Sequence, residues 1–398
     1  MTDRQPDNES LSNQKKRILF VVNEAFFFLS HRRALGEALL EGGYEVHIAA
    51  PADHAWAPQE FDSAELAKIG FTMHTISLSR RGQNPLAELA TIVGIFRLVQ
   101  RLRPDILHLL TIKPVLYGGL IGRILGIPLV VSGFTGLGQV FSDEVGPWVR
   151  LRRWIVCLVL RLSLSGRRSL ALVQNSDDQK TVADVVRNAR IVVIQGSGVA
   201  VSEYPLTPIP NEQPIVMLAA RLLWEKGVGV FVEAARLVKA DGVSARFVLV
   251  GKTVEANPRS VPRQQLEAWV TEGVVEWWGY RDDMAATLSQ CSVFCLPTIY
   301  REGVPKVLME AASLGRPVVT SNLGGCGEIV DHGINGFTCL PSDPQAVAQH
   351  VKRLLLDRDL CRRLGMANRQ VAEQRFDVKK IVKQTIDAYS GHFQLVSD

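Results

Sequence analysis

The chain has 398 residues, 47% of them hydrophobic and 21% charged, and its 45 Lys and Arg against 40 Asp and Glu give a net charge of +5. This composition is typical of an ordinary globular protein, and the length favours two domains over one hydrophobic core. The modest charge argues against a nucleic-acid-binding protein, and the six cysteines form no Cys-x-x-Cys pair, which disfavours a zinc site or a disulfide framework.

The N-terminal half of the sequence predicts a doubly wound α/β unit. Residues 1–16 are polar and lack the apolar segment of a signal peptide, which predicts a disordered tail and a cytoplasmic protein. From residue 17, apolar runs alternate with helical stretches, as in a parallel sheet covered by helices on both faces. The predicted strands are 18–22, 46–50, 106–110, 129–132, 170–174 and 191–194. The predicted helices between them are 31–41, 85–102 and 115–125.

A basic amphipathic helix is predicted at residues 147–168. Its positive side chains, interleaved with Trp, Ile and Leu, are Arg150, Arg152, Arg153, Arg161, Arg167 and Arg168. Such a helix is typical of an element that lies on a membrane surface, near an anionic lipid diphosphate. A half-buried domain helix with a solvated basic face is an equally good interpretation. A membrane-spanning role is disfavoured, because the uncharged run 154–160 is far shorter than the roughly twenty residues needed.

A second α/β unit follows a linker. Residues 202–214 contain four prolines and no periodic apolar pattern, which is the composition of a linker. The first unit is therefore assigned to 17–201 and the second to 215–376, with a final helical segment at 377–398. The predicted strands of the second unit are 215–219, 247–250, 274–277, 293–296, 318–320 and 337–340. Ligands bind beyond the carboxyl ends of such strands, so two facing units create a cleft between them.

Two carboxylates bracket a Gly/Pro turn at the predicted start of a helix. Glu302 precedes this turn, and Glu310 lies in the helix that follows it. The open amides of a helix N-terminus suit a diphosphate. Glu310 can accept both hydroxyls of a ribose, while Glu302 can hold hydroxyls of a transferred sugar. Two glutamates at this spacing also occur on solvated helix faces, so the pair alone does not decide the function.

Two cations follow the first strand of the second unit. Arg221 and Lys226 are predicted in a turn opposite the Glu302 loop. There they could neutralise the charge that develops on a departing nucleotide diphosphate. The alternative is an ordinary pair of surface cations beside Glu225.

Taken together, the second half resembles the retaining glycosyltransferases of family four. The segments that carry the resemblance are Ala220-Arg221, Glu225-Lys226-Gly227, Gly279-Tyr280-Arg281-Asp282-Asp283, Leu296-Pro297, Arg301-Glu302-Gly303-Val304-Pro305, Glu310-Ala311, Gly315-Arg316-Pro317-Val318-Val319 and Gly333-Ile334-Asn335-Gly336-Phe337. The resemblance implies the GT-B fold of two Rossmann-like domains, and a final segment that packs back on the N-terminal domain. It also implies that Arg221 and Lys226 bind the donor diphosphate, that Glu302 contacts the donor sugar and that Glu310 binds the ribose.

The same resemblance assigns the remaining donor contacts. The amides around Gly303, Val304 and Lys306 would complete the phosphate site, and the region of Lys252, Tyr280 and Arg281 would read the base of a UDP-sugar. No Asp-x-Asp metal-ligand set stands at the strand ends. Neither a metal nor a cofactor beyond the donor sugar is therefore expected, because cations and a helix dipole can replace the metal.

The first half narrows the resemblance to a subgroup. The segments Phe28-Leu29-Ser30-His31-Arg32, Thr111-Ile112-Lys113-Pro114-Val115-Leu116-Tyr117-Gly118 and Ser132-Gly133-Phe134-Thr135-Gly136-Leu137-Gly138 are similar to those of bacterial enzymes that extend sugars on undecaprenyl diphosphate for glycan, O-antigen or capsule repeats. The implied partners are a lipid-linked saccharide and the cytoplasmic face of the inner membrane. One departure is Glu24-Ala25-Phe26-Phe27, where many relatives carry a Gly-Gly turn.

Four residues of the first half are candidates near the cleft, three of them with open alternatives. His31 is predicted to open a helix and to contact acceptor or phosphate, and packing alone is an equal alternative. His108 is placed near the donor sugar by the resemblance, and a core histidine is its alternative. Lys113 could meet the acceptor diphosphate, or serve only as a surface residue. Gly136 belongs to the predicted acceptor region.

The leading hypothesis is a retaining transfer of a hexose or N-acetylhexosamine from a UDP-sugar to a lipid-linked saccharide. A related enzyme that acts on a soluble acceptor is the first alternative. A non-catalytic nucleotide-binding scaffold of a polysaccharide assembly complex is the second. The complete set of Arg221, Lys226, Glu302 and Glu310 argues against the scaffold.

Overall fold

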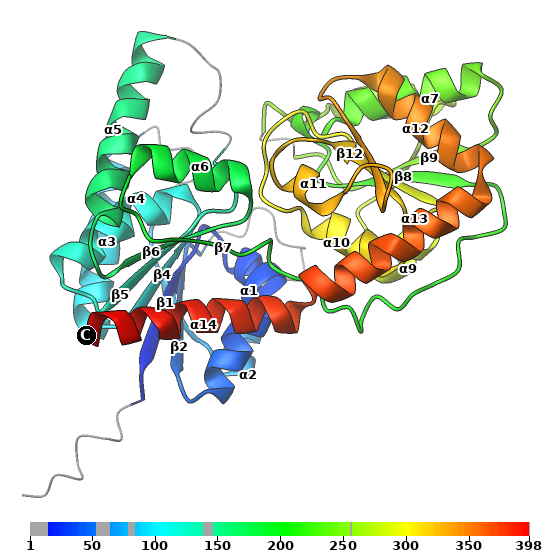
Figure 1. Cartoon of the computed structure of the whole chain (residues 1–398). Coiled ribbons are helices and arrows are strands. Elements are labelled where there is room, and N and C mark those ends of the chain that lie inside the picture. The colour runs from blue at the N-terminus through cyan, green and yellow to red at the C-terminus, as the bar shows by residue number, and fades with distance from the viewer. Residues whose placement is uncertain (1–14, 53–63, 79–83, 138–145, 255–256, 398) are drawn as a thin grey trace, which may run out of the picture.

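The protein consists of two α/β lobes that lie side by side (Figure 1). The computed structural model describes residues 15–52, 64–78, 84–137, 146–254 and 257–397. Most of the predicted tail at residues 1–16 lies outside this part of the chain. Each lobe contains one parallel sheet between layers of helices, which is the architecture of the GT-B fold.

The N-terminal lobe contains a seven-stranded parallel sheet in the order β3-β2-β1-β4-β5-β6-β7. Its strands are β1 (Arg17–Val21), β2 (Glu45–Ala50), β3 (Thr72–Thr75), β4 (Ile106–Leu110), β5 (Leu129–Gly133), β6 (Ser169–Val173) and β7 (Ile191–Val193). Its helices are α1 (Ala25–Glu41), α2 (Ala64–Ile69), α3 (Pro85–Leu102), α4 (Ile112–Ile124), α5 (Pro147–Leu164) and α6 (Ser176–Val185). Strands β4, β5 and β6 are buried along their whole length. This burial explains their unbroken apolar sequences.

The C-terminal lobe contains a six-stranded parallel sheet in the order β10-β9-β8-β11-β12-β13. Its strands are β8 (Ile215–Ala219), β9 (Arg246–Val250), β10 (Glu276–Gly279), β11 (Val293–Leu296), β12 (Val318–Ser321) and β13 (Gly336–Cys339). Its helical elements are η1 (Trp224–Lys226), α7 (Val228–Ala240), α8 (Arg263–Thr271), α9 (Met284–Ser289), α10 (Lys306–Ser313), α11 (Gly324–Ile329), α12 (Pro344–Leu356), α13 (Arg358–Val371) and η2 (Ala372–Phe376). The central strands β8 and β11 are neighbours, so the loops that follow them meet at one edge of the sheet.

Several sequence predictions differ from the structure. Helix α4 begins at Ile112 instead of residue 115, and α5 ends at Leu164, so that Arg167 and Arg168 of the predicted helix 147–168 lie outside it. Helix α1 begins at Ala25 instead of residue 31, because its first turns bury Phe28 against Phe20 and Phe71. Strand β3 was not predicted, since it is a half-exposed edge strand without an apolar run. Strand β10 covers residues 276–279, two residues later than the predicted 274–277.

The chain crosses between the lobes a second time near its end. After η2, helix α14 (Val378–Ser397) runs back along the N-terminal lobe (Figure 1). There Ile381 and Tyr389 join the hydrophobic core behind α1 and β1. The two crossings touch each other, because the Val199 amide donates to Phe376 O and the Val378 amide donates to Val199 O, both at 2.9 Å. The lobes are thus joined at one side by two adjacent backbone segments.

Candidate active site

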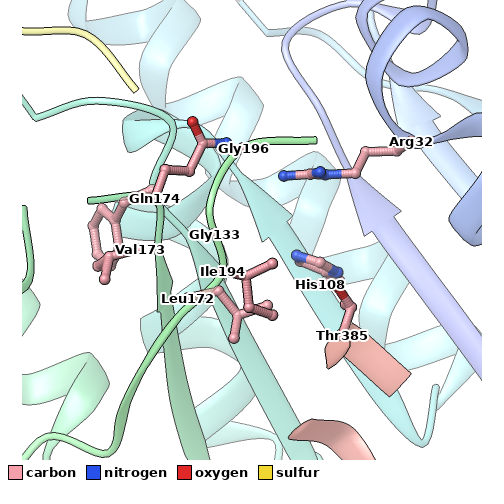
Figure 2. A pocket seen from close by; sticks show the side chains of 10 residues that line it. Arg32, His108, Gly133, Leu172, Val173, Gln174, Ile194, Gly196 and Thr385 are labelled. Atoms are coloured by element: carbon pink, nitrogen blue, oxygen red, sulfur yellow. The ribbon is translucent and has the colours of Figure 1, made fainter. Parts of the chain in front are cut away.

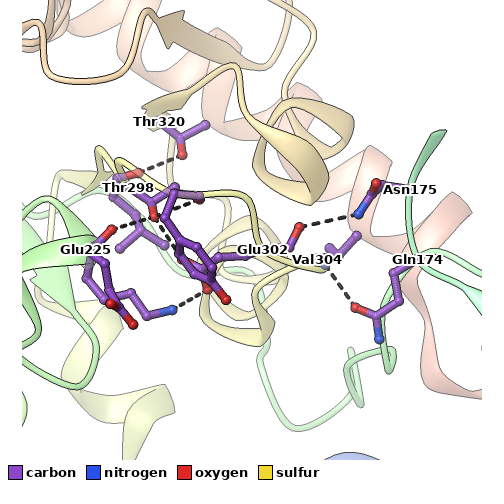
Figure 3. A network of polar contacts seen from close by, with 10 residues as sticks. Gln174, Asn175, Glu225, Thr298, Glu302, Val304 and Thr320 are labelled. Carbon is purple, nitrogen blue, oxygen red and sulfur yellow. Dashed lines mark hydrogen bonds and ion pairs between the residues drawn. The ribbon is translucent and has the colours of Figure 1, made fainter. Parts of the chain in front are cut away.

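Glu302 is held in the cleft by side chains that follow the two central strands of the C-terminal lobe. Thr298 follows β11, and its Oγ1 donates to Glu302 Oε1 at 2.9 Å. Lys226, which ends η1 after β8, forms an ion pair with Glu302 Oε2. Both members of this pair are largely buried, with 13% and 12% of their side chains exposed. Figure 3 shows this network around the Glu302 carboxylate. The structure therefore brings together the loop of Lys226, predicted to bind the diphosphate, and the loop of Glu302, predicted to contact the sugar.

Gly227 sets the position of the Lys226 turn. Its φ is +76°, and a Cβ built on it would lie 1.9 Å from the carbonyl oxygen of Pro297. A side chain cannot fit there without moving the backbone, and the left-handed conformation itself favours glycine. The turn therefore approaches the end of β11 closely enough for Lys226 to reach Glu302.

Glu310 lies in the first turns of α10 and is 5% exposed. Its Oε1 is 3.4 Å from Lys306 Nζ and accepts a hydrogen bond of 3.0 Å from the Tyr204 hydroxyl. The helix begins at Lys306, so Glu302 stands in the loop before it. The two carboxylates thus face the cleft from different elements.

Basic groups from both lobes lie close enough to His31 for their charges to act on it. His31 on α1 has its pKa lowered to about 3, first by burial and then by the positive charges of Lys306, Arg32 and Arg221. Lys306 and Arg221 belong to the C-terminal lobe, so His31 faces them across the cleft. Positive charges this close to one another repel, and a bound anion would relieve that repulsion. His31 therefore lies near Lys306 and Arg221 of the C-terminal lobe, in the second turn of α1 and not at its start.

The predicted base region also comes together. Lys252 Nζ lies 5.5 Å from the centre of the Tyr280 ring. The Arg281 guanidinium lies 5.9 Å from the Trp278 ring centre. These side chains follow β9 and β10, next to the strand that leads to Arg221. An exposed tyrosine ring flanked by a lysine is a surface on which a planar base can stack.

The N-terminal lobe forms hydrogen bonds with the backbone of the Glu302 loop. Gln174 Oε1 accepts a hydrogen bond of 3.0 Å from the Val304 amide, and Asn175 Nδ2 donates to Glu302 O at 3.3 Å. The Val304 amide was expected at the diphosphate, and its partner in the structure is Gln174. A Cβ on Gly303 would lie 2.0 Å from Gln174 Oε1, and a Cβ on Gly136 would lie 2.8 Å from the Gly303 amide nitrogen. Only glycines permit this approach of the two lobes.

A second contact between the lobes is made by Glu328 of α11. Its Oε1 accepts a bond of 2.9 Å from the Ser176 amide at the start of α6, and its Oε2 accepts from Gln195 Nε2 at 2.9 Å. Burial alone would raise the pKa of Glu328, but these hydrogen bonds hold it below its usual value. A carboxylate at a helix N-terminus is a favourable arrangement. Glu328 and the Glu302 loop thus hold the cleft closed on the same side.

His108 does not lie at the cleft surface, which corrects its predicted contact with the donor sugar. It is 1% exposed, and its Nδ1 is 2.6 Å from the Tyr389 hydroxyl of α14. Burial lowers its pKa well below the ordinary value, which keeps the ring neutral. It lines a cavity of about 10 Å³, enough for one water, together with Arg32 and Thr385 (Figure 2). His108 is therefore a core histidine, which was the alternative to its predicted contact with the sugar.

Lys113 forms an ion pair within the N-terminal lobe. Its Nζ lies 2.8 Å from Glu88 Oε1 of α3, and the Tyr117 hydroxyl donates to the other oxygen of the same carboxylate. This pairing uses the charge of Lys113 within the N-terminal lobe and does not test its predicted contact with an acceptor diphosphate. Among the described residues, no group of three His, Cys, Asp or Glu is placed to hold a metal ion.

Sequence reasoning missed several residues of the site. Thr298 follows one predicted strand and Gln174 ends another, and this position at the carboxyl edge of a sheet was a usable signal. Tyr204 lies in the proline-rich linker, where no local pattern points to a carboxylate 106 residues away.

The chain matches two family descriptions, one in each lobe. Residues 17–158 match the family described as Glycosyl transferase 4-like, and residues 213–357 match Glycosyl transferases group 1. Among curated relatives, the N,N'-diacetylbacillosaminyl-diphospho-undecaprenol alpha-1,3-N-acetylgalactosaminyltransferase of Campylobacter jejuni is 26% identical, covering 94% of this chain and 98% of the relative. The putative glycosyltransferase EpsD of Bacillus subtilis is 23% identical, covering 96% and 98%.

Solved structures show the same fold. Anabaena HepE in complex with UDP-glucose superposes with a TM-score of 0.74 at 19% identity, covering 94% of this chain and 99% of that one. WaaG, a glycosyltransferase involved in lipopolysaccharide biosynthesis, superposes with a TM-score of 0.69 at 13% identity, covering 93% and 98%. Matched in both lobes and along nearly its whole length, the chain belongs to the glycosyltransferases of family four and has their GT-B fold.

Proposed function

We propose that this protein transfers a hexose or N-acetylhexosamine from a UDP-sugar to a saccharide carried on undecaprenyl diphosphate, with retention of the anomeric configuration. The observation that carries the proposal is the buried contact between Lys226 and Glu302 at the mouth of the cleft. The Campylobacter relative, whose name specifies a diphospho-undecaprenol acceptor, supports the acceptor class. The fold shared with a UDP-glucose complex agrees with a UDP-sugar donor.

In the proposed donor site, cations bind the diphosphate and carboxylates bind the hydroxyl groups. Arg221, Lys226 and Lys306 are the cations for the diphosphate, and the N-terminus of α10 adds its dipole. Glu310 accepts the ribose hydroxyls, and Glu302 accepts hydroxyls of the transferred sugar. This set supplies the positive charge that a leaving diphosphate requires, so we propose that neither a cofactor nor a metal takes part.

In the proposed reaction, the acceptor hydroxyl attacks the anomeric carbon on the face from which UDP leaves. The bond from that carbon to the β-phosphate oxygen breaks, and the new glycosidic bond forms on the same side. The proton of the acceptor hydroxyl passes to the departing phosphate. Lys226 stabilises the charge on that phosphate as it leaves, and closure of the lobes excludes water that would otherwise hydrolyse the donor.

Helix α5 offers a surface for the membrane that carries such an acceptor. Six large apolar side chains on it are exposed, and spacings of three and four residues place them on one face of the helix. These residues are Trp148, Leu151, Trp154, Ile155, Leu158 and Leu162. Only Leu160, Ser163 and Leu164 of this helix are buried. A continuous exposed stripe of this size marks an interaction surface.

The positive charges of α5 favour an anionic bilayer as its partner. Arg150, Arg152 and Arg153 are exposed beside the apolar stripe, in the part of the helix that stands at the outer side of the N-terminal lobe (Figure 1). Basic side chains beside an apolar face are the pattern of a helix that lies in the plane of the membrane surface. No helix in the described part of the chain is long and apolar enough to cross a membrane. We therefore place the protein peripherally on the cytoplasmic face of the inner membrane.

The donor assignment is tested by calorimetric titration of the protein with UDP, GDP and ADP in the presence of a chelator. Selective binding of UDP is expected. A radiolabelled UDP-sugar is then offered to an undecaprenyl-diphosphate saccharide and to the same saccharide without its lipid. Transfer only to the lipid-linked acceptor supports the proposal. Equal transfer to both would show that the acceptor is a soluble saccharide, and binding without any transfer would indicate a scaffold.

The membrane assignment is tested with vesicles of phosphatidylglycerol and phosphatidylcholine. Replacing Arg150, Arg152 and Arg153 together by Ser is expected to lower vesicle association at least tenfold, since each basic residue near an anionic surface contributes about 1 kcal/mol. The matched control removes three exposed positive charges elsewhere by replacing Lys379, Lys380 and Lys383 by Ser. Equal losses in both variants would indicate that net charge alone governs binding. Unchanged binding of the α5 variant would leave this helix as an ordinary domain helix.

A further inference from the structure

Tyr204 connects the interdomain linker to the carboxylate assigned to the ribose. The residue lies between β7 and β8, in the segment that joins the two lobes. Its hydroxyl donates to Glu310 Oε1 at 3.0 Å. The phenol is half-buried, and burial together with the charge of Glu310 raises its pKa, so it remains a donor at neutral pH.

The two oxygens of Glu310 have different surroundings. Oε1 accepts from Tyr204 and lies 3.4 Å from Lys306 Nζ. Oε2 makes no hydrogen bond with the described residues, and it is not one of the buried oxygens left without a partner. Oε2 is therefore the oxygen that solvent reaches, although the residue as a whole is 5% exposed. A carboxylate fixed through one oxygen presents the other in a defined direction.

The linker around Tyr204 is attached to the C-terminal lobe. Arg369 Nη1 donates to the Tyr204 carbonyl oxygen at 2.7 Å. Thr207 and Pro208 follow three and four residues after Tyr204. The fully buried Arg316 donates to their carbonyl oxygens at 3.2 Å and 3.3 Å. These contacts hold the backbone at the tyrosine and on its C-terminal side. The position of its hydroxyl is therefore set by the lobe that carries Glu310.

We propose that Tyr204 is a positioning residue for nucleotide recognition, which fixes the Glu310 carboxylate so that its free oxygen accepts the ribose hydroxyls of the donor. This inference rests on the proposed role of Glu310 and adds a residue of the linker to it. Tyr204 acts through Glu310 and does not touch the nucleotide. Its effect is therefore limited to ligands that carry ribose hydroxyls.

The test compares UDP with 2′,3′-dideoxy-UDP by titration calorimetry on wild type and on Tyr204→Phe. The variant removes one oxygen atom and keeps the ring. We expect a loss of about fivefold to tenfold in affinity for UDP, as for one hydrogen bond to a charged group that is only partly replaced by water. Affinity for dideoxy-UDP should not change. In transfer assays the donor KM should rise by the same factor while kcat stays constant.

A matched control removes a phenol hydroxyl from the other lobe. Tyr44 is half-buried against the core of the N-terminal lobe, and Tyr44→Phe is expected to leave both affinities as in wild type. Thermal melts of both variants show whether either one has lost its fold.

Each remaining outcome of the comparison has one meaning. Equal losses for UDP and dideoxy-UDP in Tyr204→Phe, or no loss for either, would overturn the inference. A wild-type protein that binds the two ligands equally would show that Glu310 does not read the ribose, which overturns the inference and leaves the transferase function standing. A wild-type protein that binds no UDP would contradict the proposed function itself, and the inference with it.

Discussion

Glu302→Gln separates the two roles of the contact between Glu302 and Lys226. The carboxylate neutralises Lys226, which is assigned to the donor diphosphate, and is itself assigned to the donor sugar. The amide keeps the size of the side chain and can still accept the bond from Thr298 Oγ1. The substitution should therefore remove the charge and retain the loop.

The structure sets the size and the sign of the effect on UDP. Two unit charges about 4 Å apart attract by about 4 kcal/mol at an effective dielectric constant of 20. Most of that attraction is offset by desolvation of the two groups, which are 13% and 12% exposed. If about 1 kcal/mol remains, freeing Lys226 should tighten UDP binding about fivefold. Transfer should nevertheless fall at least a hundredfold, because the sugar loses a charged hydrogen-bond acceptor in the transition state.

Titration calorimetry with UDP and a transfer assay with the UDP-sugar measure the two effects separately. The matched control is Glu225→Gln, which removes a carboxylate that neighbours Lys226 in sequence but pairs with Arg259. Glu225→Gln should change UDP affinity by less than twofold. A tenfold weaker binding of UDP by Glu302→Gln would refute the reasoning, since it would mean that the carboxylate supports the nucleotide site and does not compete for its cation.

Three further variants test other parts of the site. Gly227→Ala should weaken UDP binding at least tenfold, because its Cβ would lie 1.9 Å from Pro297 O and must displace the Lys226 turn; unchanged affinity would show that the turn adapts. Burial raises the pKa of Asp178 to about 6 from the ordinary 3.8, so the folded state loses stability as pH rises between these values. Asp178→Asn should flatten this slope in urea unfolding, and an unaltered slope would contradict the shift. His108→Gln should lower the free energy of unfolding by about 1–2 kcal/mol and leave kcat within twofold; a hundredfold loss of kcat at wild-type stability would return His108 to the reaction centre.

The donor side of the site was predictable because it follows from strand order. Lys226 and Glu302 come after neighbouring parallel strands, so their loops must meet at one edge of the sheet. The apolar runs that predicted those strands are long because both faces of the sheet are covered. Position in such a sheet thus fixes which loops meet before any side chain is placed.

Contacts between the lobes were not predictable in this way. The bonds from Gln174 to Val304 and from Tyr204 to Glu310 join segments more than 100 residues apart. The bond between Gln174 and Val304 depends on the relative orientation of the two lobes. The bond between Tyr204 and Glu310 depends on the path of a linker without periodicity. The early start of α1 was missed for a related reason, because Phe28 is helical through its packing on Phe71 and not through local propensity.

The Glu302 loop is held from both lobes at once. The first set of contacts lies within the C-terminal lobe: Thr298 and Lys226 hold the Glu302 side chain, and the Gly325 amide donates to its carbonyl oxygen. The second set reaches the N-terminal lobe: Asn175 Nδ2 donates to the same carbonyl oxygen, and the Val304 amide donates to Gln174. Opening the cleft breaks the second set and leaves the first. The carboxylate therefore keeps both of its partners when the lobes separate, and only the loop backbone loses contacts. In the proposed reaction, closure of the lobes thus acts on the backbone of the loop that carries Glu302 and not on the partners of its carboxylate.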